Sequence, residues 1–385
     1  MKPVYLLVFA QFLSAFADNA VLFTIIAIVL HAGGRGDWYV PALQSVFLLA
    51  YVFLTPWVGT LADRLPKPRV LILANLVKAA GAFALFLGVE PLIGYGVIGI
   101  GAAAYGPAKY GILPELTGAG NLVRANGWVE GATIAAILCG TVGGARLADA
   151  SIDRALVAVI SLYVLSGAAA LFLPRLPARG VAPGPALRKL IGLIRGLLGS
   201  QRARLVLVAL SLFWASAATL RVVLVAWAPE VLGVRTATDI AELTVYLAVG
   251  IVIGSGLVPR LIPLEHVRRT RFAAYGMGAS FLILAGVDQL WPARAVLLAI
   301  GVSGGIFVVP LNAAIQQIGH GTAGGGSAVA VQNFFQNGAI LAAMGLYTLA
   351  AAQGVGSVAI ILALGTAVWL STVLVSLRLP RYPAV

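Results

Sequence analysis

The sequence predicts an all-α membrane protein with twelve transmembrane helices, arranged as two pseudo-symmetric bundles of six. Of its 385 residues, 61% are hydrophobic and only 10% are charged, whereas a soluble domain has about 25% charged residues. Apolar runs long enough to cross a bilayer recur along the whole chain, and a basic, proline-containing segment divides them into two equal sets. Such a chain exposes more apolar surface than water can solvate, so lipid is its expected solvent.

Each predicted span is a mostly apolar run of about 20 residues, the length that a helix needs to cross ~30 Å of hydrocarbon. The first run is too long for the apolar part of a cleaved signal peptide, and Asp18 and Asn19 interrupt it, so it is predicted to be a transmembrane helix. The spans are predicted at residues 4–30, 40–62, 70–89, 92–113, 125–148, 155–173, 204–230, 240–262, 272–289, 293–317, 327–350 and 357–377.

The distribution of basic residues predicts the orientation of the chain. An even number of spans places both termini on one side of the membrane, and the side richer in Lys and Arg is cytoplasmic. Most of the 26 Lys and Arg residues lie in the termini and in the loops that share their side. Both termini are therefore predicted to be cytoplasmic, and topology explains the net charge of +13 without any nucleic-acid partner. The opposite loops hold Arg35, Arg146, Arg154, Arg235 and Arg294.

A change in composition divides the chain into a first bundle at 1–174, a cytoplasmic linker at 175–203 and a second bundle at 204–385. The linker holds several prolines and no acidic residue. From Leu187 to Leu198 its leucines and isoleucines recur at helical spacing among basic residues, a pattern typical of a short amphipathic helix on an anionic membrane surface. A disordered basic linker is the alternative.

Among the ionisable residues inside the predicted spans, five stand out as the first candidates for function. A charge at the bilayer centre costs at least ~2.5 kcal/mol, so such residues are rarely kept without a role. Both signs are present, which suits a zwitterionic ligand, because Arg and Lys hold a phosphate while carboxylates face an ammonium group or hydroxyls. The alternatives are an internal ion pair, such as Lys109 with Glu130, and a Lys78 side chain that reaches an interface. The five are Asp18, Lys78, Lys109, Glu130 and Arg221.

Uncharged polar side chains extend this candidate substrate-binding site. Asn19 follows Asp18 in the first span, Asn312 lies in the tenth, and Gln332 and Asn333 begin a polar face in the eleventh. Polar residues in spans often only join neighbouring helices, which is the alternative. The sequence shows no catalytic set, no metal-ligand constellation and no cofactor motif, so we expect neither an enzyme nor a cofactor.

The segment after the second span resembles the loop signature of the major facilitator superfamily. Residues 59–69 read GTLADRLPKPR, beside the usual pattern G-x-L-a-D-r-x-G-r-k-r. The resemblance implies the major facilitator fold, in which helices 1, 4, 7 and 10 line the cavity and this loop contacts neighbouring cytoplasmic helix ends, latching the outward-facing state. Pro66 replaces the usual glycine and stiffens the turn. This implied latch consists of Gly59, Asp63, Arg64, Lys67 and Arg69. The alternative for its basic residues is that they only fix the orientation of the loop on the cytoplasmic side.

Longer runs in both halves resemble the bacterial lysophospholipid transporters. The runs read AQFLSAFADNA at 10–20, YGPAKYGIL at 105–113, SLFW at 211–214 with TLR at 219–221, VVPLN at 308–312 and AVQN at 330–333. That family moves lysophosphatidylethanolamine and lysophosphatidylglycerol from the outer to the inner leaflet of the bacterial inner membrane. The resemblance implies the same substrates and location here, with the family's polar cavity residues at Asp18, Asn19, Lys109, Glu130 and Arg221.

A lysolipid substrate agrees with the residue pattern, since it needs a polar pocket for its head group and an apolar, lipid-accessible route for its tail. We expect alternating access, with the two halves rocking around a site near mid-membrane. The resemblance also implies a cytoplasmic acyltransferase/acyl-carrier-protein synthetase that restores the missing acyl chain. This partner is expected to be a separate protein, because the chain ends at Val385, just past the last span.

Two other classes of protein are the alternatives. The first is a major facilitator exporter or proton-coupled porter of soluble solutes or drugs, with Asp18 or Glu130 as proton carrier. The second is an intramembrane serine enzyme built on Ser303. It is disfavoured because all three histidines lie outside the predicted spans, which leaves the serine without a base.

Overall fold

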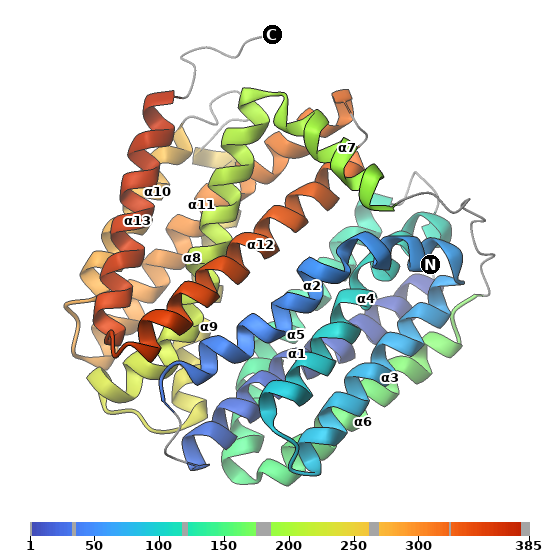
Figure 1. Cartoon of the computed structure of the whole chain (residues 1–385), viewed down its shortest axis with the longest axis horizontal. Coiled ribbons are helices and arrows are strands. Elements are labelled where there is room, and N and C mark those ends of the chain that lie inside the picture. Colours follow the sequence, from blue (N-terminus) through green and yellow to red (C-terminus); the bar gives the residue numbers. More distant parts are fainter. Residues whose placement is uncertain are drawn as a thin grey trace. The chain divides into compact units, whose positions relative to one another are not determined.

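A computed structural model describes residues 2–32, 36–117, 122–174, 186–261, 269–322 and 325–378. Within these residues the chain forms helices and no strand, and each predicted span corresponds to one helix. The helices in Figure 1 are α1 (Lys2–Ala32), α2 (Tyr39–Arg64), α3 (Lys67–Phe86), α4 (Pro91–Thr117), α5 (Leu122–Ala150), α6 (Ile152–Leu171), α7 (Ala186–Leu198), α8 (Gln201–Leu232), α9 (Ala237–Leu261), α10 (Thr270–Leu284), α11 (Leu290–Thr322), α12 (Gly325–Ala352) and α13 (Ser357–Arg378).

Among the described residues, nine helices are long and apolar enough to cross a membrane. Large apolar side chains on the outer surfaces of the bundle, such as Phe272, Trp291 and Leu346, are mostly exposed, as expected where lipid replaces water. The count of twelve spans stays a prediction. The nine helices are α1, α3, α5, α6, α8, α9, α11, α12 and α13.

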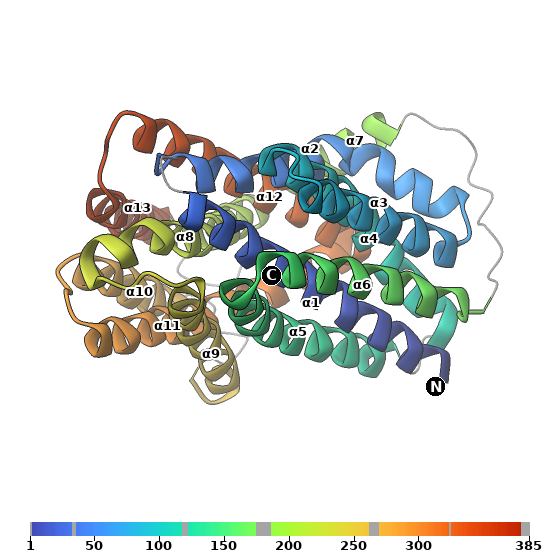
Figure 2. The same cartoon turned by 90° about the horizontal axis from the view of Figure 1, so that it is seen from below.

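The chain divides into two compact units. Unit 1 contains α1, α3, α4, α5, α6 and most of α2, and unit 2 contains α8, α10, α11, α12, α13 and most of α7 and α9. Two short segments belong to a different unit from the rest of their helix. Residues 36–42, at the start of α2, belong to unit 2, and residues 236–241, at the start of α9, belong to unit 1. Within unit 1, α1 packs against both α5 and α6, and the three run side by side in Figure 2.

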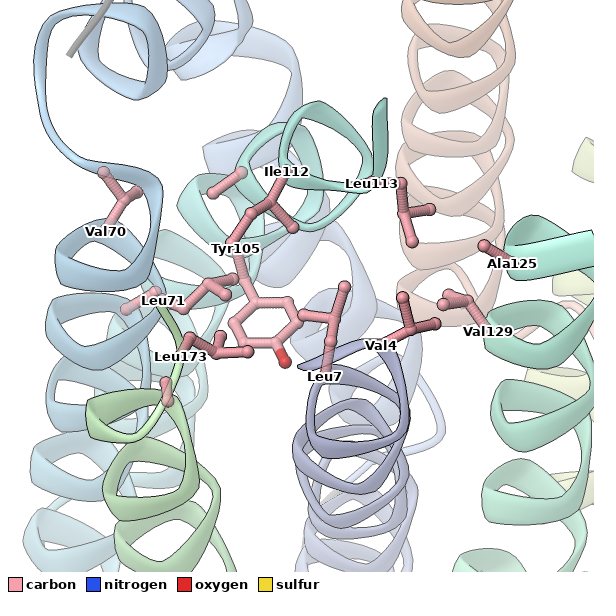
Figure 3. Packing of buried hydrophobic residues seen from close by; sticks show 13 residues of the cluster. Val4, Leu7, Val70, Leu71, Tyr105, Ile112, Leu113, Ala125, Val129 and Leu173 are labelled. Carbon is pink, nitrogen blue, oxygen red and sulfur yellow. The ribbon is translucent and has the colours of Figure 1, made fainter. Parts of the chain in front are cut away.

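One cluster of buried apolar residues in unit 1 is built from α1, α3, α4, α5 and the end of α6 (Figure 3). Leu7, Leu71 and Ile112 are fully enclosed in it, each at 0% exposure. The ring of Tyr105 lies among these aliphatic side chains. Tyr105 also joins this core to the polar residues described below, because the ammonium group of Lys78 lies over its ring.

Local signals set the helix ends. Ser151 caps α6, where its side chain accepts a 3.3 Å hydrogen bond from the Arg154 N–H, and Ser200 caps α8 in the same way. Gly233 follows α8 with a φ of 69°, a left-handed conformation that glycine adopts without strain. Pro66 precedes α3, and its carbonyl accepts a 2.8 Å hydrogen bond from the Arg69 N–H. The proline therefore starts α3 directly, leaving only residues 65–66 between α2 and α3.

Glycines bring α9 and α11 into backbone contact within unit 2. A Cβ at Gly254 would lie 2.1 Å from the Val302 carbonyl oxygen, and one at Gly305 would lie 2.3 Å from that of Ile251. Gly250 and Gly301 make a similar approach one turn away. Small residues four apart on both helices allow this packing, which membrane bundles use because lipid provides no hydrophobic force between helices.

Candidate functional site

Asp18 lies within α1 at the centre of a polar cluster inside unit 1. Its Oδ2 accepts a 2.9 Å hydrogen bond from Lys78 Nζ, and its Oδ1 accepts one of 2.9 Å from Tyr163 Oη. The side chain of Asp18 is 27% exposed, whereas that of Lys78 is 1% exposed. The carboxylate is therefore the accessible member of this ion pair. We call the following residues the Asp18 cluster: Ser14, Asp18, Asn75, Lys78, Tyr163 and Ser166.

Lys78 is enclosed on several sides. Its Nζ donates a 2.9 Å hydrogen bond to Ser14 Oγ and lies 4.7 Å and 5.5 Å from the ring centroids of Tyr105 and Tyr163. The side chain does not extend to an interface, a possibility that the sequence left open. A buried ammonium group needs a counter-ion, and Asp18 provides it.

A chain of hydrogen bonds continues from Ser14 across α1, α3 and α6. Ser14 Oγ donates to Asn75 Oδ1 at 3.0 Å, and Asn75 Nδ2 donates to Ser166 Oγ at 3.0 Å. Ser166 Oγ donates in turn to the Ala10 carbonyl at 2.7 Å. Because these groups are buried and satisfy one another, the chain fixes the three helices in one arrangement around Asp18.

The other predicted residues of unit 1 are placed differently. Asn19 Nδ2 donates a 2.8 Å hydrogen bond to the Ala15 carbonyl of its own helix. Lys109 is buried in α4, at 7% exposure. Glu130 lies in α5, but its side chain is outside the described part of the structure.

In unit 2, two of the predicted polar residues meet. Gln332 Nε2 on α12 donates a 2.7 Å hydrogen bond to Asn312 Oδ1 on α11. Gln332 is buried, Asn333 is exposed, and Arg221 on α8 is half-buried. The sequence indicated these four residues individually but did not predict the contact.

The predicted latch residues are described only in part. Lys67 is the first residue of α3, and its Nζ forms a 2.5 Å ion pair with Glu115 Oε1 on α4, where the side chains are 4% and 14% exposed. Arg69 is exposed. The remaining latch positions lie in the last two turns of α2, where the helix is described but the side chains are not: Gly59, Asp63 and Arg64.

Asp149, at the end of α5, makes contacts that sequence reasoning missed. Its Oδ1 accepts a 3.1 Å hydrogen bond from the Ala237 N–H, and its Oδ2 accepts one of 2.9 Å from the Thr238 N–H and another from the Thr238 hydroxyl. The carboxylate thus satisfies N–H groups of the first turn of α9 and meets its positive dipole end. The sequence signal was only an acidic residue directly after a predicted span, which names no partner.

An apolar cavity of about 410 Å³ lies between α1, α5 and α6 in unit 1. Phe16 and Ala20 line it from α1 and Leu165 from α6. Because Phe16 and Ala20 are each two residues from Asp18, they face the opposite side of the helix. This cavity is therefore separate from the Asp18 carboxylate, and none of the predicted site residues whose side chains are described lines it.

Comparison with known sequences relates the chain to membrane transporters. A family model described as the Major Facilitator Superfamily matches residues 7–344. A protein of Photorhabdus laumondii named lysophospholipid transporter LplT is 44% identical over 361 residues, which cover 93% of this chain and 90% of the relative. A protein of the same name from Salmonella gallinarum is 46% identical over 364 residues, with the same coverage.

Comparison with solved structures supports the same fold. A crystal structure of the nucleoside transporter NupG superposes with a TM-score of 0.74 at 14% sequence identity, over 99% of this chain and 100% of that one. The D323A mutant of NupG gives a TM-score of 0.70 at 15% identity, over 97% and 98% of the two chains. At such low identity the likeness concerns the fold alone.

Proposed function

Because this chain belongs to the major facilitator superfamily and, within it, to the lysophospholipid transporter family, we propose that it transports lysophospholipids across the bacterial inner membrane. The proposed substrates are lysophosphatidylethanolamine and lysophosphatidylglycerol, moved from the outer to the inner leaflet. Alternating access of two helical bundles is the proposed mechanism, as in other transporters built from repeated halves. In this proposal the protein moves its substrate without changing any covalent bond, so it is a transporter and not an enzyme.

The Asp18 carboxylate is the structural observation that supports this proposal. It is 27% exposed, yet it belongs to the span Pro3–His31, where a charge facing lipid would be costly. A lysolipid head group offers the ammonium group or hydroxyls that such a carboxylate binds, while Lys109 and Arg221 are proposed to hold the phosphate. The remaining proposed contacts are Asn19, Glu130, Asn312, Gln332 and Asn333.

Transport by the purified chain in lipid vesicles tests the proposal. Labelled lysophosphatidylethanolamine or lysophosphatidylglycerol is added to the outside, and the fraction protected from extraction by albumin measures movement to the inner leaflet. Nucleosides and other soluble solutes form the comparison panel. We expect protection of lysolipids above protein-free vesicles and no uptake of soluble compounds. Uptake of a soluble solute without movement of lysolipid would overturn the proposal in favour of a soluble-solute porter.

Two substitutions test the proposed site. Asp18→Ala and Arg221→Ala are expected to lower lysolipid transport about tenfold or more, because a hydrogen bond to a charged group contributes ~1.5–3 kcal/mol. Arg204→Ala is the matched control, since Arg204 is exposed on the same helix as Arg221. Folded variants that transport lysolipid at the wild-type rate would remove these residues from the site.

The location and partner extend the proposal. Both termini are proposed to lie in the cytoplasm, on the side where a separate acyltransferase/acyl-carrier-protein synthetase would re-acylate the delivered lysolipid. Depleting that enzyme in cells should leave lysolipid entry intact and let unmodified lysolipid accumulate inside. If depletion also abolished lysolipid entry, transport would depend on the acyltransferase.

A further inference from the structure

Lys78 is buried and forms an ion pair with the partly exposed Asp18 carboxylate. Its side chain is 1% exposed, and its Nζ lies 2.9 Å from Asp18 Oδ2. Gly101 on α4 leaves room for it, since a Cβ at that position would lie 2.7 Å from Lys78 Cγ. Together with the hydrogen bond to Ser14, this packing gives the ammonium group one position, beside the carboxylate.

The pair therefore presents a carboxylate whose charge is largely compensated. A lone Asp18 carboxylate in a low-dielectric site would attract the ammonium group of an ethanolamine head and repel any phosphate nearby. A glycerol head group carries a phosphate but no ammonium group. The Asp18 carboxylate would therefore repel its phosphate and attract no other group. With Lys78 adjacent, the repulsion falls, while the partly exposed carboxylate still accepts hydrogen bonds from hydroxyls or ammonium.

Resting on the proposed lysolipid transport, we infer that Lys78 is a specificity residue that acts through Asp18 and admits anionic as well as zwitterionic head groups. Lys78 is thus a positioning and charge-compensating residue and makes no contact with the head group. This role differs from a packing role alone, because it predicts opposite changes in head-group preference when either member of the pair loses its charge.

The experiment measures transport of lysophosphatidylethanolamine and lysophosphatidylglycerol side by side in vesicles. Lys78→Met should lower the rate for the glycerol head about tenfold relative to the ethanolamine head, the size expected for one uncompensated charge about 10 Å away in a partly screened site. Asp18→Asn, which leaves the lysine charge in place, should shift the preference the other way, toward the glycerol head.

Two further variants separate charge from packing. The double variant Lys78→Met with Asp18→Asn should return the ratio of the two rates close to the wild-type value, and Lys78→Arg should preserve it. Parallel loss of both substrates in Lys78→Met and in Asp18→Asn would overturn the inference and leave a packing role. If Lys78→Met does not fold, the shift in Asp18→Asn still decides, because an unchanged ratio there contradicts charge compensation.

The wild-type measurement separates this inference from the proposed function. Movement of both lysolipids by the wild-type chain, with ratios unaffected by the variants, would leave the proposed function standing and overturn the role of Lys78. Failure of the wild-type chain to move either lysolipid would overturn both.

Discussion

Asp149 accepts a 2.9 Å hydrogen bond from the backbone N–H of Thr238, so the last residues of α5 hold the first turn of α9. The helix α9 therefore begins in unit 1 and continues in unit 2. By the predicted topology this contact lies on the side of the membrane opposite the cytoplasm. Both partners belong to unit 1, although they lie 89 residues apart in the chain.

Replacing Asp149 with Ala is expected to lower the free energy of unfolding by ~1–2 kcal/mol, because N–H groups of the α9 first turn lose their acceptor. The thermal unfolding midpoint in detergent measures the effect. Asp288→Ala is the control, since Asp288 is exposed and also acidic. Equal midpoints for the two variants would mean that the cap contributes nothing to stability.

Glu115→Gln is expected to destabilise unit 1 by ~3 kcal/mol, because it leaves the buried Lys67 ammonium group without its counter-ion. Replacing both partners, as Lys67→Met with Glu115→Gln, should cost less than the single change. Thermal unfolding of Glu115→Gln, of Lys67→Met and of the double variant measures the interaction energy between the two side chains. Additive losses would contradict a functional ion pair between α3 and α4.

Gly254→Ala is expected to lower the thermal unfolding midpoint, since its Cβ would lie 2.1 Å from the Val302 carbonyl oxygen and force α9 away from α11. A cost of ~1–3 kcal/mol is typical of overpacking. Gly256→Ala on the same helix is the matched control, because a Cβ there meets nothing within 4 Å. A loss of equal size at both positions would point to helix backbone effects instead of contact with α11.

Cysteine labelling tests the predicted topology. In a Cys139→Ala background, which removes the only native cysteine, Arg188→Cys on α7 should react with an impermeant maleimide only after the membrane is opened. Asp153→Cys, in the first turn of α6, should react in intact spheroplasts. The reason is that Lys- and Arg-rich loops face the cytoplasm, and the predicted topology places the connection between α5 and α6 on the opposite side. Both native residues are exposed. Labelling of Arg188→Cys in intact spheroplasts, with Asp153→Cys labelled only after the membrane is opened, would show the opposite orientation.

The helices were predictable from the sequence, while most contacts between them were not. Long apolar runs specify helices in lipid because a helix satisfies its backbone hydrogen bonds within a single segment. Asp18 and Lys78 were each identified by their cost in the membrane. Their pairing was not predicted, because they lie 60 residues apart and the packing of α1 on α3 decides which side chains meet.

Tyr163 and Ser14 show a second limit. A tyrosine or serine in an apolar run is ordinary in a membrane helix, so nothing in the sequence marks Tyr163 as the donor to Asp18 or Ser14 as the acceptor for Lys78. Asn312 and Gln332 were identified as polar, but their hydrogen bond depends on how α11 faces α12. Residue type indicates which groups need partners, and packing selects the partners.

The burial of Lys78 also bears on how the chain enters the membrane during synthesis. A lysine within a span raises the free energy of membrane insertion by ~2.5–3.5 kcal/mol. If α3 inserts alone, only its apolar residues offset this cost. Its counter-ion is already made, because Asp18 lies on α1, 60 residues earlier in the chain. We therefore expect α1 to remain beside the insertion site until α3 arrives, so that the two helices enter lipid as a neutral pair. The order of synthesis would then assist the biogenesis of the first half.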